Sequence, residues 1–203
     1  MKKIGITLMA VSMMAISCKE NKEEVAGERN ATEMLESETS AVANNIKIMP
    51  ISHATFVMDW DGQIIYVDPV GGTTVFKEMP AADVTLITDV HYDHLEEETL
   101  AAVKGKSVLI TPQAVADKMM DLKSTHIINN GETKTIKGIK ITAVPMYNLT
   151  EGRLDMHVKG RGNGYVLEKN AYRVYISGDT EAIPEMRALK NIDKAFVCMN
   201  LPY

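Results

Sequence analysis

Two carboxylates and two imidazoles fall within six consecutive residues of this chain: Asp89, His91, Asp93 and His94. They directly follow Val84 to Thr88, an apolar and largely β-branched run that predicts a strand covered on both faces. Zinc accepts neutral imidazole nitrogen and carboxylate oxygen together, at about 2.0 to 2.2 Å. Because donors this close in sequence tend to point to opposite sides of a turn, the pattern predicts two neighbouring metal sites. Asp89 and His91 would serve one, and Asp93 and His94 the other.

A second interpretation of the same loop remains open. Asp93 could be the N-cap of the helix that the acidic residues Glu96, Glu97 and Glu98 begin, with both histidines on the surface.

The loop resembles the signature loop of the metallo-β-lactamase-fold hydrolases, whose usual form is His-x-His-x-Asp-His after a buried strand. Asp89 stands in the place of the first His, so a charged oxygen donor replaces a nitrogen donor. The resemblance keeps Asp89 as a metal ligand. The harder donor is expected to change the metal preference of the first site or to weaken binding there.

Two further segments carry the resemblance. Gly178-Asp179-Thr180 is similar to the second signature of the family, in which the Asp bridges both metals. His157 stands 22 residues before Asp179, a spacing similar to that of the third His in family members, so the resemblance implies a ligand of the first metal. The alternative for His157 is a surface residue in a mobile loop. The implied cofactor is one or two zinc ions, with Mn or Fe as alternatives.

The resemblance also implies residues that support the metals or face the substrate. Asp68 is expected to support the metal-binding loop from behind. His53 could face the substrate, although a histidine hydrogen-bonded under the sheet is an equal alternative. The residues expected to line the substrate mouth, where positive charge could hold an anionic group, are Tyr147, Asn148, Lys159 and Arg161.

The elements that must position these residues predict an α+β fold. The resemblance implies an αβ/βα sandwich of two mixed sheets with outer helices and the metals at one edge. The predicted strands are 46–48, 55–58, 64–67, 84–88, 107–110, 126–128, 133–136, 139–144, 164–168, 172–176 and 194–199, and the predicted helices are 96–104, 112–122 and 183–191. Strand 107–110 is expected to be parallel, and the strands between 126 and 144 to be antiparallel.

The first 45 residues differ in character from the rest. Residues 1–17 have a basic start and a short apolar run, which predict a signal peptide. The sequence Ala15-Ile16-Ser17-Cys18 resembles a bacterial lipobox, so Cys18 is expected to be acylated and to anchor the protein to a lipid membrane of the bacterial cell envelope, facing the periplasm or the exterior. The alternative is an ordinary signal peptide with an incidental Cys.

Residues 18–45 are interpreted as a flexible acidic tether, and residues 46–203 as one metallo-β-lactamase-like domain. The tether holds seven Glu against three Lys or Arg, which is minus four of the formal net charge of minus five. The domain therefore has no basic excess, which argues against nucleic acid as a partner. Cys198 is expected to be a buried, inert thiol, and His126 a surface residue that binds no metal.

The resemblance implies a metal-dependent hydrolase for a small-molecule substrate. In such sites a metal-bound hydroxide, formed because the water's pKa falls to about 7, attacks a lactone, amide or phosphodiester, and Asp93 is expected to orient the water or accept its proton. Three short segments, His-Ala-Thr at 53–55, Val-Asp-Pro at 67–69 and Gly-Asn-Gly-Tyr-Val at 162–166, resemble those of the subgroup that contains ascorbate-phosphate lactonase-like and phospholipase D-like proteins. The alternative, motivated by Asp89 and by the early end of the chain, is a tethered binding protein that kept the fold and lost catalysis.

The histidines of the chain leave one position of the family pattern unmatched. Family members carry a further His after the strand that follows the Gly-Asp-Thr turn, and all five histidines of this chain precede that turn. We therefore expect a C-terminal part of the domain to be missing from the 203 residues.

Overall fold

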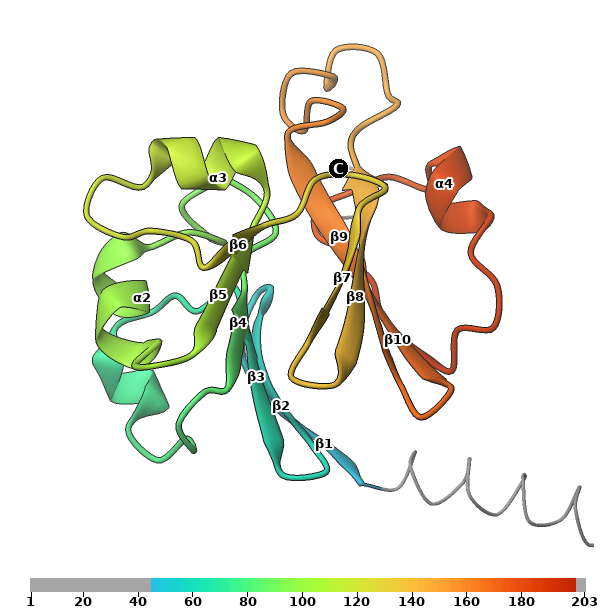
Figure 1. Ribbon diagram of the computed structural model, residues 1–203. Coiled ribbons are helices and arrows are strands. Elements are labelled where there is room, and N and C mark those ends of the chain that lie inside the picture. The colour runs from blue at the N-terminus through green and yellow to red at the C-terminus, as the bar shows by residue number, and fades with distance from the viewer. Residues whose placement is uncertain (1–44, 200–203) are drawn as a thin grey trace, which may run out of the picture. The chain divides into compact units, whose positions relative to one another are not determined.

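The computed structural model describes residues 45–199, which form two β-sheets packed face to face with helices outside them (Figure 1). The predicted signal peptide, Cys18 and all but the last residue of the tether lie outside the described residues. Within them, no helix is long and apolar enough to cross a membrane.

The first sheet has the strand order β1-β2-β3-β4-β5-β6. Strands β1, β2 and β3 are antiparallel. The turn that joins β2 to β3 is the hairpin turn that Asp61-Gly62 predicts, and these residues have positive φ angles of 54° and 76°. From β3 onward the pairing is parallel. The elements are β1 (Ile46–Ser52), β2 (Thr55–Trp60), β3 (Gln63–Val67), the short 3₁₀ helix η1 (Thr73–Phe76), β4 (Val84–Leu86), α2 (Glu97–Val103), β5 (Val108–Thr111), α3 (Gln113–Lys118) and β6 (His126–Ile127).

The second sheet has the order β11-β10-β9-β8-β7 and is antiparallel except for the parallel pair β10 and β11. Both sheets are therefore mixed, as predicted. The elements are β7 (Thr133–Ile136), β8 (Ile139–Met146), β9 (Gly162–Lys169), β10 (Tyr172–Ile176), α4 (Pro184–Arg187) and β11 (Lys194–Phe196).

Several predicted elements differ from those of the structure. The strand expected at 126–128 is not antiparallel: β6 pairs in parallel with β5 and belongs to the first sheet, because α3 provides the crossover that parallel neighbours need. Helix α3 ends at Lys118, since Met119 is already extended, and α4 has four residues where 183–191 was expected. Leu189 and Ile192 still pack on the sheet. The apolar residues that predicted a helix there therefore contact the sheet although their segment is not helical.

Three layers of apolar contact hold the sandwich together. The central one lies between the sheets and includes Met58 and Trp60 of β2 facing Tyr165 and Leu167 of β9. On the outer face of the first sheet, Ile87 and Leu109 pack against residues of α2, α3 and the segments beside them. On the outer face of the second, the buried side chains of Val144, Val166 and Tyr175 contact Met186 from α4 and the segment after it. Figure 1 shows α2 and α3 outside the first sheet and α4 outside the second. Burial on both faces explains why these strands are apolar runs.

Candidate metal centre

The loop after β4 divides its four donors between two groups. The backbone N–H groups of His94 and Leu95 both donate to the carbonyl of His91, at 3.0 and 2.8 Å, which forms a tight turn. On one side of this turn lie Asp93 and His94, with His53 and Asp179. On the other side lie Asp89 and His91, with His157. The division of the loop follows the sequence prediction, and we refer to the two groups as the His94 cluster and the Asp89 cluster.

The His94 cluster brings together donors from three separate parts of the chain. His53 comes from the turn between β1 and β2, Asp93 and His94 from the loop after β4, and Asp179 from the end of β10. The Nε2 atom of His53 lies 3.1 Å from Oδ2 of Asp93, and Nε2 of His94 lies 3.3 Å from Oδ2 of Asp179. One donor atom from each residue lies within 4.8 Å of the others, which is compatible with four ligands around a single ion.

His94 is held from behind by Asp68, the residue that the resemblance placed behind the metal-binding loop. Nδ1 of His94 lies 2.8 Å from Oδ2 of Asp68, and both side chains are buried. Thr88 donates its hydroxyl proton to the same carboxylate oxygen and its backbone N–H to the other one. Since the Thr88 proton is already committed, the Nδ1 proton of His94 is donated to Asp68, and the neutral ring then carries its lone pair on Nε2.

The Nε2 atom of His94 fits a metal ligand. It is fully buried, has no hydrogen-bond partner among the described residues and faces the carboxylate of Asp179. A buried polar atom without a partner is costly, and a bound cation would satisfy it. The carboxylate behind the imidazole is the arrangement that orients metal-binding histidines in proteins. The residues present therefore fit a divalent ion in the His94 cluster.

In the His94 cluster, charged groups from the two sheets shift each other's pKa values. Burial lowers the pKa of His94, but the carboxylates of Asp68 and Asp179 outweigh burial and raise it to about 11. Burial raises the pKa of Asp179, but its contacts with His157 and His94 outweigh burial and hold that pKa well below its ordinary value. These shifts favour the protonated ring, so a metal has to compete with a proton for Nε2, whereas Asp68 retains the proton on Nδ1.

The Asp89 cluster has different surroundings. Nδ1 of His91 lies 2.8 Å from Oδ2 of the fully buried Asp89, and the rings of His91 and His157 meet edge to face at 5.0 Å. The amide oxygen of Asn148 lies 3.1 Å from Nδ1 of His157, whose Nε2 is 3.4 Å from Asp179. Arg161 also enters this cluster and pairs with Asp89. Three predicted ligands are thus brought together, with a cation already beside them.

Contacts between the sheets fix the position of the loop after β4. The backbone N–H of Asn163 in β9 donates to the carbonyl of Thr88 at 2.9 Å, and the Tyr165 hydroxyl donates to the carbonyl of Ile87 at 2.8 Å. At Gly178 the backbone has φ +59°, and an added Cβ would lie 3.2 Å from Cβ of Thr88. The sequence Gly-Asp-Thr therefore allows the end of β10 to approach the end of β4, which places Asp179 beside His94.

The other residues expected at the substrate mouth are engaged with neighbours. The Tyr147 hydroxyl donates to Glu185 at 2.9 Å, and Lys159 donates to the other carboxylate oxygen of Glu185, also at 2.9 Å. Asn148 donates to the carbonyl of Arg153 and contacts His157, so it positions that histidine. In this structure the positive charge of Lys159 is paired, and it is not free to hold an anionic group.

Two expectations about single residues are corrected or refined. Cys198 is half-buried, where a fully buried thiol was expected, and its Sγ contacts the carbonyl of Thr180 at 3.1 Å. Strand β11 ends at Phe196, two residues before this Cys. His126 is half-buried in β6 and belongs to neither cluster.

Sequence reasoning missed two relationships. His53 was assigned to the substrate side or to the sheet interior, but the structure places it among the donors of the His94 cluster. Its position depends on the β1–β2 turn, where its φ is +48°. The pairing of Arg161 with Asp89 was missed too, although an unusual Asp in a histidine position was a signal to look for a compensating cation.

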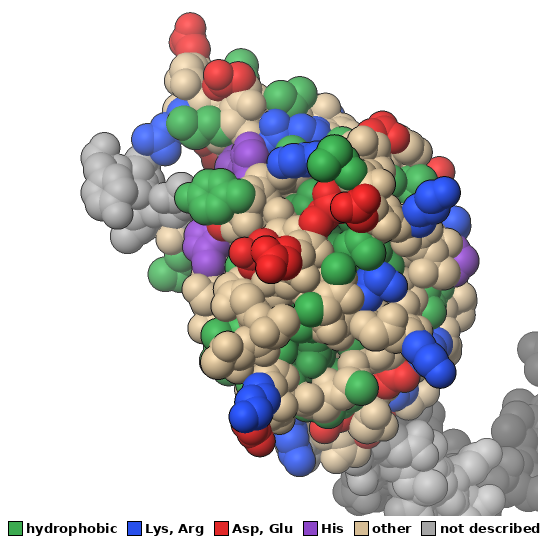
Figure 2. Space-filling model, turned by 90° about the vertical axis from the view of Figure 1, so that its left-hand side faces the viewer, with side chains coloured by type: hydrophobic (Ala, Val, Ile, Leu, Met, Phe, Trp, Pro, Cys, Tyr) green, Lys and Arg blue, Asp and Glu red, His purple; other side chains and the backbone are tan. Residues whose placement is uncertain are grey.

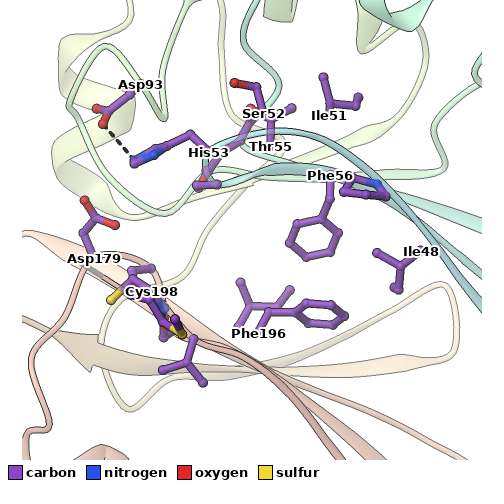
Figure 3. A pocket seen from close by; sticks show the side chains of 18 of the residues that line it. Ile48, Ile51, Ser52, His53, Thr55, Phe56, Asp93, Asp179, Phe196 and Cys198 are labelled. Carbon is purple, nitrogen blue, oxygen red and sulfur yellow. Dashed lines mark hydrogen bonds and ion pairs between the residues drawn. The ribbon is translucent and has the colours of Figure 1, made fainter. Parts of the chain in front are cut away.

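A cavity of about 780 Å³ opens beside the His94 cluster. Figure 3 shows His53, Asp93 and Asp179 at one end of it and apolar side chains, including Phe56 and Phe196, at the other. The volume lies within the range of small-molecule sites, about 300 to 1,000 Å³. The carboxylates and imidazole therefore face a space in which a small molecule could lie.

Known proteins with similar sequences and structures are consistent with this site. A family model described as the beta-lactamase superfamily domain matches residues 47–200. A metal-dependent hydrolase from Koribacter versatilis is 30% identical over 166 residues, covering 76% of this chain and 71% of that protein. A metal-dependent hydrolase from Thermococcus onnurineus is 26% identical and covers 72% of this chain and 67% of that protein. The chain thus spans about two thirds of the length of these relatives.

Solved structures show the same fold. A crystal structure from Parabacteroides distasonis, described as a metal-dependent hydrolase, superposes with a TM-score of 0.70 at 40% identity and covers 78% of this chain and 71% of that one. The metallo hydrolase Igni18 from Ignicoccus hospitalis has a TM-score of 0.56 at 20% identity, covering 70% of this chain and 64% of that one, and supports the fold alone. Together with the two mixed sheets and the donor loop between them, these matches show that the chain belongs to the metallo-β-lactamase superfamily.

Proposed function

We propose that this protein is a hydrolase that uses a divalent metal in the His94 cluster to cleave a lactone, amide or phosphodiester bond of a small molecule. Metal-dependent hydrolysis is the activity given in the names of the relatives described above. The observation that carries the proposal is the buried Nε2 atom of His94, which has no hydrogen-bond partner among the described residues and faces Asp179. The relatives are described as hydrolases, so the alternative of a binding protein without catalysis gains no support.

The chemistry of the donors favours zinc. The His94 cluster mixes two imidazoles with two carboxylates, a set that suits borderline divalent ions, so Mn and Fe are the alternatives. A bound ion would act as a Lewis acid that makes a water more acidic and polarises the substrate oxygen that gains charge.

The residues of the cluster have separate tasks in this proposal. Asp93 holds the attacking water and accepts its proton, because its carboxylate is partly exposed to the cavity. His53, with Nε2 3.1 Å from Asp93, lies beside that carboxylate and is a further candidate ligand of the ion. Asp68 keeps the Nδ1 proton on His94. Apolar side chains at the far end of the cavity, such as Phe56 and Phe196, would contact an apolar part of the substrate.

The face of the protein shown in Figure 2 gives no reason to propose a nucleic-acid substrate. On the face shown in Figure 2, acidic and basic side chains alternate and form no continuous basic surface. Sequence-independent nucleic-acid binding relies on such a surface.

The test begins with metal-free protein and a panel of lactones, amides and phosphodiesters, with Zn, Mn and Fe added back separately. We expect no hydrolysis without metal and hydrolysis of at least one class after metal is restored. His94→Ala should remain inactive, whereas His126→Ala, which changes a histidine outside both clusters, should retain activity. Equal activity of the metal-free and metal-loaded protein would contradict the proposal.

Lipid anchoring is a separate proposal. The lipobox-like sequence that ends at Cys18 supports a protein tethered to a membrane of the cell envelope through an acylated Cys.

A further inference from the structure

The side chain of Arg161 lies within the Asp89 cluster. Its Nε donates to Oδ1 of Asp89 at 3.2 Å, and its Nη2 donates to Oδ2 at 3.1 Å. The same Nη2 lies 3.2 Å from Nε2 of His91 and also donates to the carbonyl of Met156. The guanidinium therefore holds both oxygens of the carboxylate in the parallel, two-bond arrangement that Arg forms with Asp.

Burial makes this pair more than a surface contact. The Asp89 side chain is 0% exposed, and an isolated carboxylate at such a position is costly. Arg161 supplies the compensating charge, and Nδ1 of His91 contributes a further contact to Oδ2 of Asp89 at 2.8 Å. Both oxygens of Asp89 thus already have partners within the chain. A metal bound to Asp89 would have to displace the guanidinium from a buried carboxylate.

The charges of the two clusters also favour a divalent ion in the His94 cluster over one in the Asp89 cluster. The Asp89 cluster has one carboxylate, which Arg161 neutralises, so a divalent ion there would face an adjacent guanidinium at close range. The His94 cluster has two carboxylates, Asp93 and Asp179, and their ion pairs among the described residues are with histidines only. A divalent cation is therefore stabilised in the His94 cluster and opposed in the Asp89 cluster.

The Asp that replaces the first His of the signature loop and the Arg that contacts it act as one unit. A neutral His in that position would offer a nitrogen and add no charge. The Asp89–Arg161 pair likewise adds no net charge, but it fills the position with a fixed cation. Arg161 is suited to this because a guanidinium stays charged at every pH that proteins experience.

We propose that the Arg161 guanidinium takes the place of a first divalent ion, so that the protein binds one metal, in the His94 cluster, and is mononuclear. This inference rests on the proposed function, because it assumes that the His94 cluster holds a metal. It assigns His91 and His157 to positions beside the guanidinium and not to a second metal.

The experiment counts bound ions in metal-free protein, by calorimetric titration with zinc and by elemental analysis after removal of free metal. Four proteins are compared: wild type, Arg161→Met, the double variant Asp89→His with Arg161→Met, and the control Arg153→Met. The control removes one positive charge from the same segment between β8 and β9 without touching Asp89. In the double variant both charges are removed together, so no buried carboxylate is left unpaired even if Arg161→Met alone does not fold.

We expect one tightly bound ion per chain in wild type and Arg153→Met, and two in the double variant, with the second site at least about tenfold tighter than any second site of wild type. Two ions of similar affinity in wild type would overturn the inference, and so would a double variant that still binds one. No bound ion in any of the proteins would instead overturn the proposed function. The two failures are thus distinguishable without an activity measurement.

Discussion

Asp68 Oδ2 lies 2.8 Å from Nδ1 of His94, and both side chains are buried behind the candidate metal site. The contact joins the end of the β2–β3 hairpin to the loop after β4, two segments 26 residues apart. It fixes which nitrogen of His94 faces Asp179. The nitrogen that His94 presents to Asp179 therefore depends on Asp68, a residue outside the group of candidate metal ligands.

Removing the charge of Asp68 should weaken metal binding. Asp68→Asn keeps the size of the side chain but can present an amide N–H to Nδ1 of His94, which favours the wrong tautomer. We expect the zinc affinity to fall by about 10- to 100-fold, the range for partners behind metal ligands. Zinc titration against a competing chelator measures this, with the exposed Asp117→Asn as the control. Unchanged affinity in Asp68→Asn would show that Asp68 does not orient His94.

His53→Ala tests whether that histidine belongs to the metal site. Its Nε2 atom lies 3.1 Å from Asp93, and its ring meets that of His94 edge to face at 5.8 Å. Loss of a ligand should reduce the zinc affinity at least about tenfold. His126→Ala is the matched control, because His126 lies outside both clusters. If the two variants bind zinc equally well, His53 faces the substrate and is not a ligand.

Gly178→Ala should lower both stability and metal affinity. Gly178 has φ +59°, and an added Cβ would lie 3.0 Å from the carbonyl oxygen of Asn163 and 3.2 Å from Cβ of Thr88. We expect a loss of about 1 to 3 kcal/mol in the free energy of unfolding, measured with urea, and a weaker zinc site because Asp179 is displaced. Gly105→Ala is the control: Gly105 has φ +50° but no atom within 4 Å of an added Cβ. Equal losses would mean that backbone conformation alone matters at Gly178.

The ion pair between Asp83 and Lys137 should make stability depend on pH in the acid range. Hydrogen bonding to Lys137 lowers the pKa of Asp83, so folding favours the ionised carboxylate. The stability that this pair contributes is present above the ordinary Asp pKa of 3.8 and is lost as the pH falls through the lower folded value. Because both side chains are partly exposed, we expect less than about 1 kcal/mol.

Urea unfolding of wild type, Asp83→Asn and Lys137→Met between pH 7 and pH 2 tests the sign of this effect. Both variants should be less stable than wild type at pH 7, and the differences should shrink towards pH 2. Differences that stay constant with pH would show that the charges of Asp83 and Lys137 do not stabilise the fold.

Cys18→Ser should release the protein from the membrane fraction of a bacterial host, because the serine cannot be acylated. The readout is the distribution of the protein between membrane and soluble fractions, together with the mass of the N-terminal residue. Cys198→Ser is the matched control, since that Cys lies in the folded domain. A Cys18→Ser protein that stays in the membrane fraction would place the anchor elsewhere.

The sequence by itself determined the types of the donors and much of the fold. Asp89, His91, Asp93 and His94 follow one predicted strand and Asp179 another, and strand ends and turns are set by local patterns of apolar residues, Gly and Asp. The division of the loop donors into two groups was predictable too, because it depends on a single tight turn. The alternation of strands and helices, together with the resemblance to the metallo-β-lactamase fold, predicted the two mixed sheets that the structure contains.

Only the tertiary structure decided which residues complete each group. His53 reaches the His94 cluster because the β1–β2 turn lies beside the loop after β4, and β6 joins the first sheet because α3 returns the chain to β5. Arg161 reaches Asp89 from 72 residues away, since the approach of β9 to the end of β4 brings the preceding loop onto the site. Such pairings depend on how the two sheets pack and on the need to pair a charge that becomes buried. The spacing of residues along the chain shows neither.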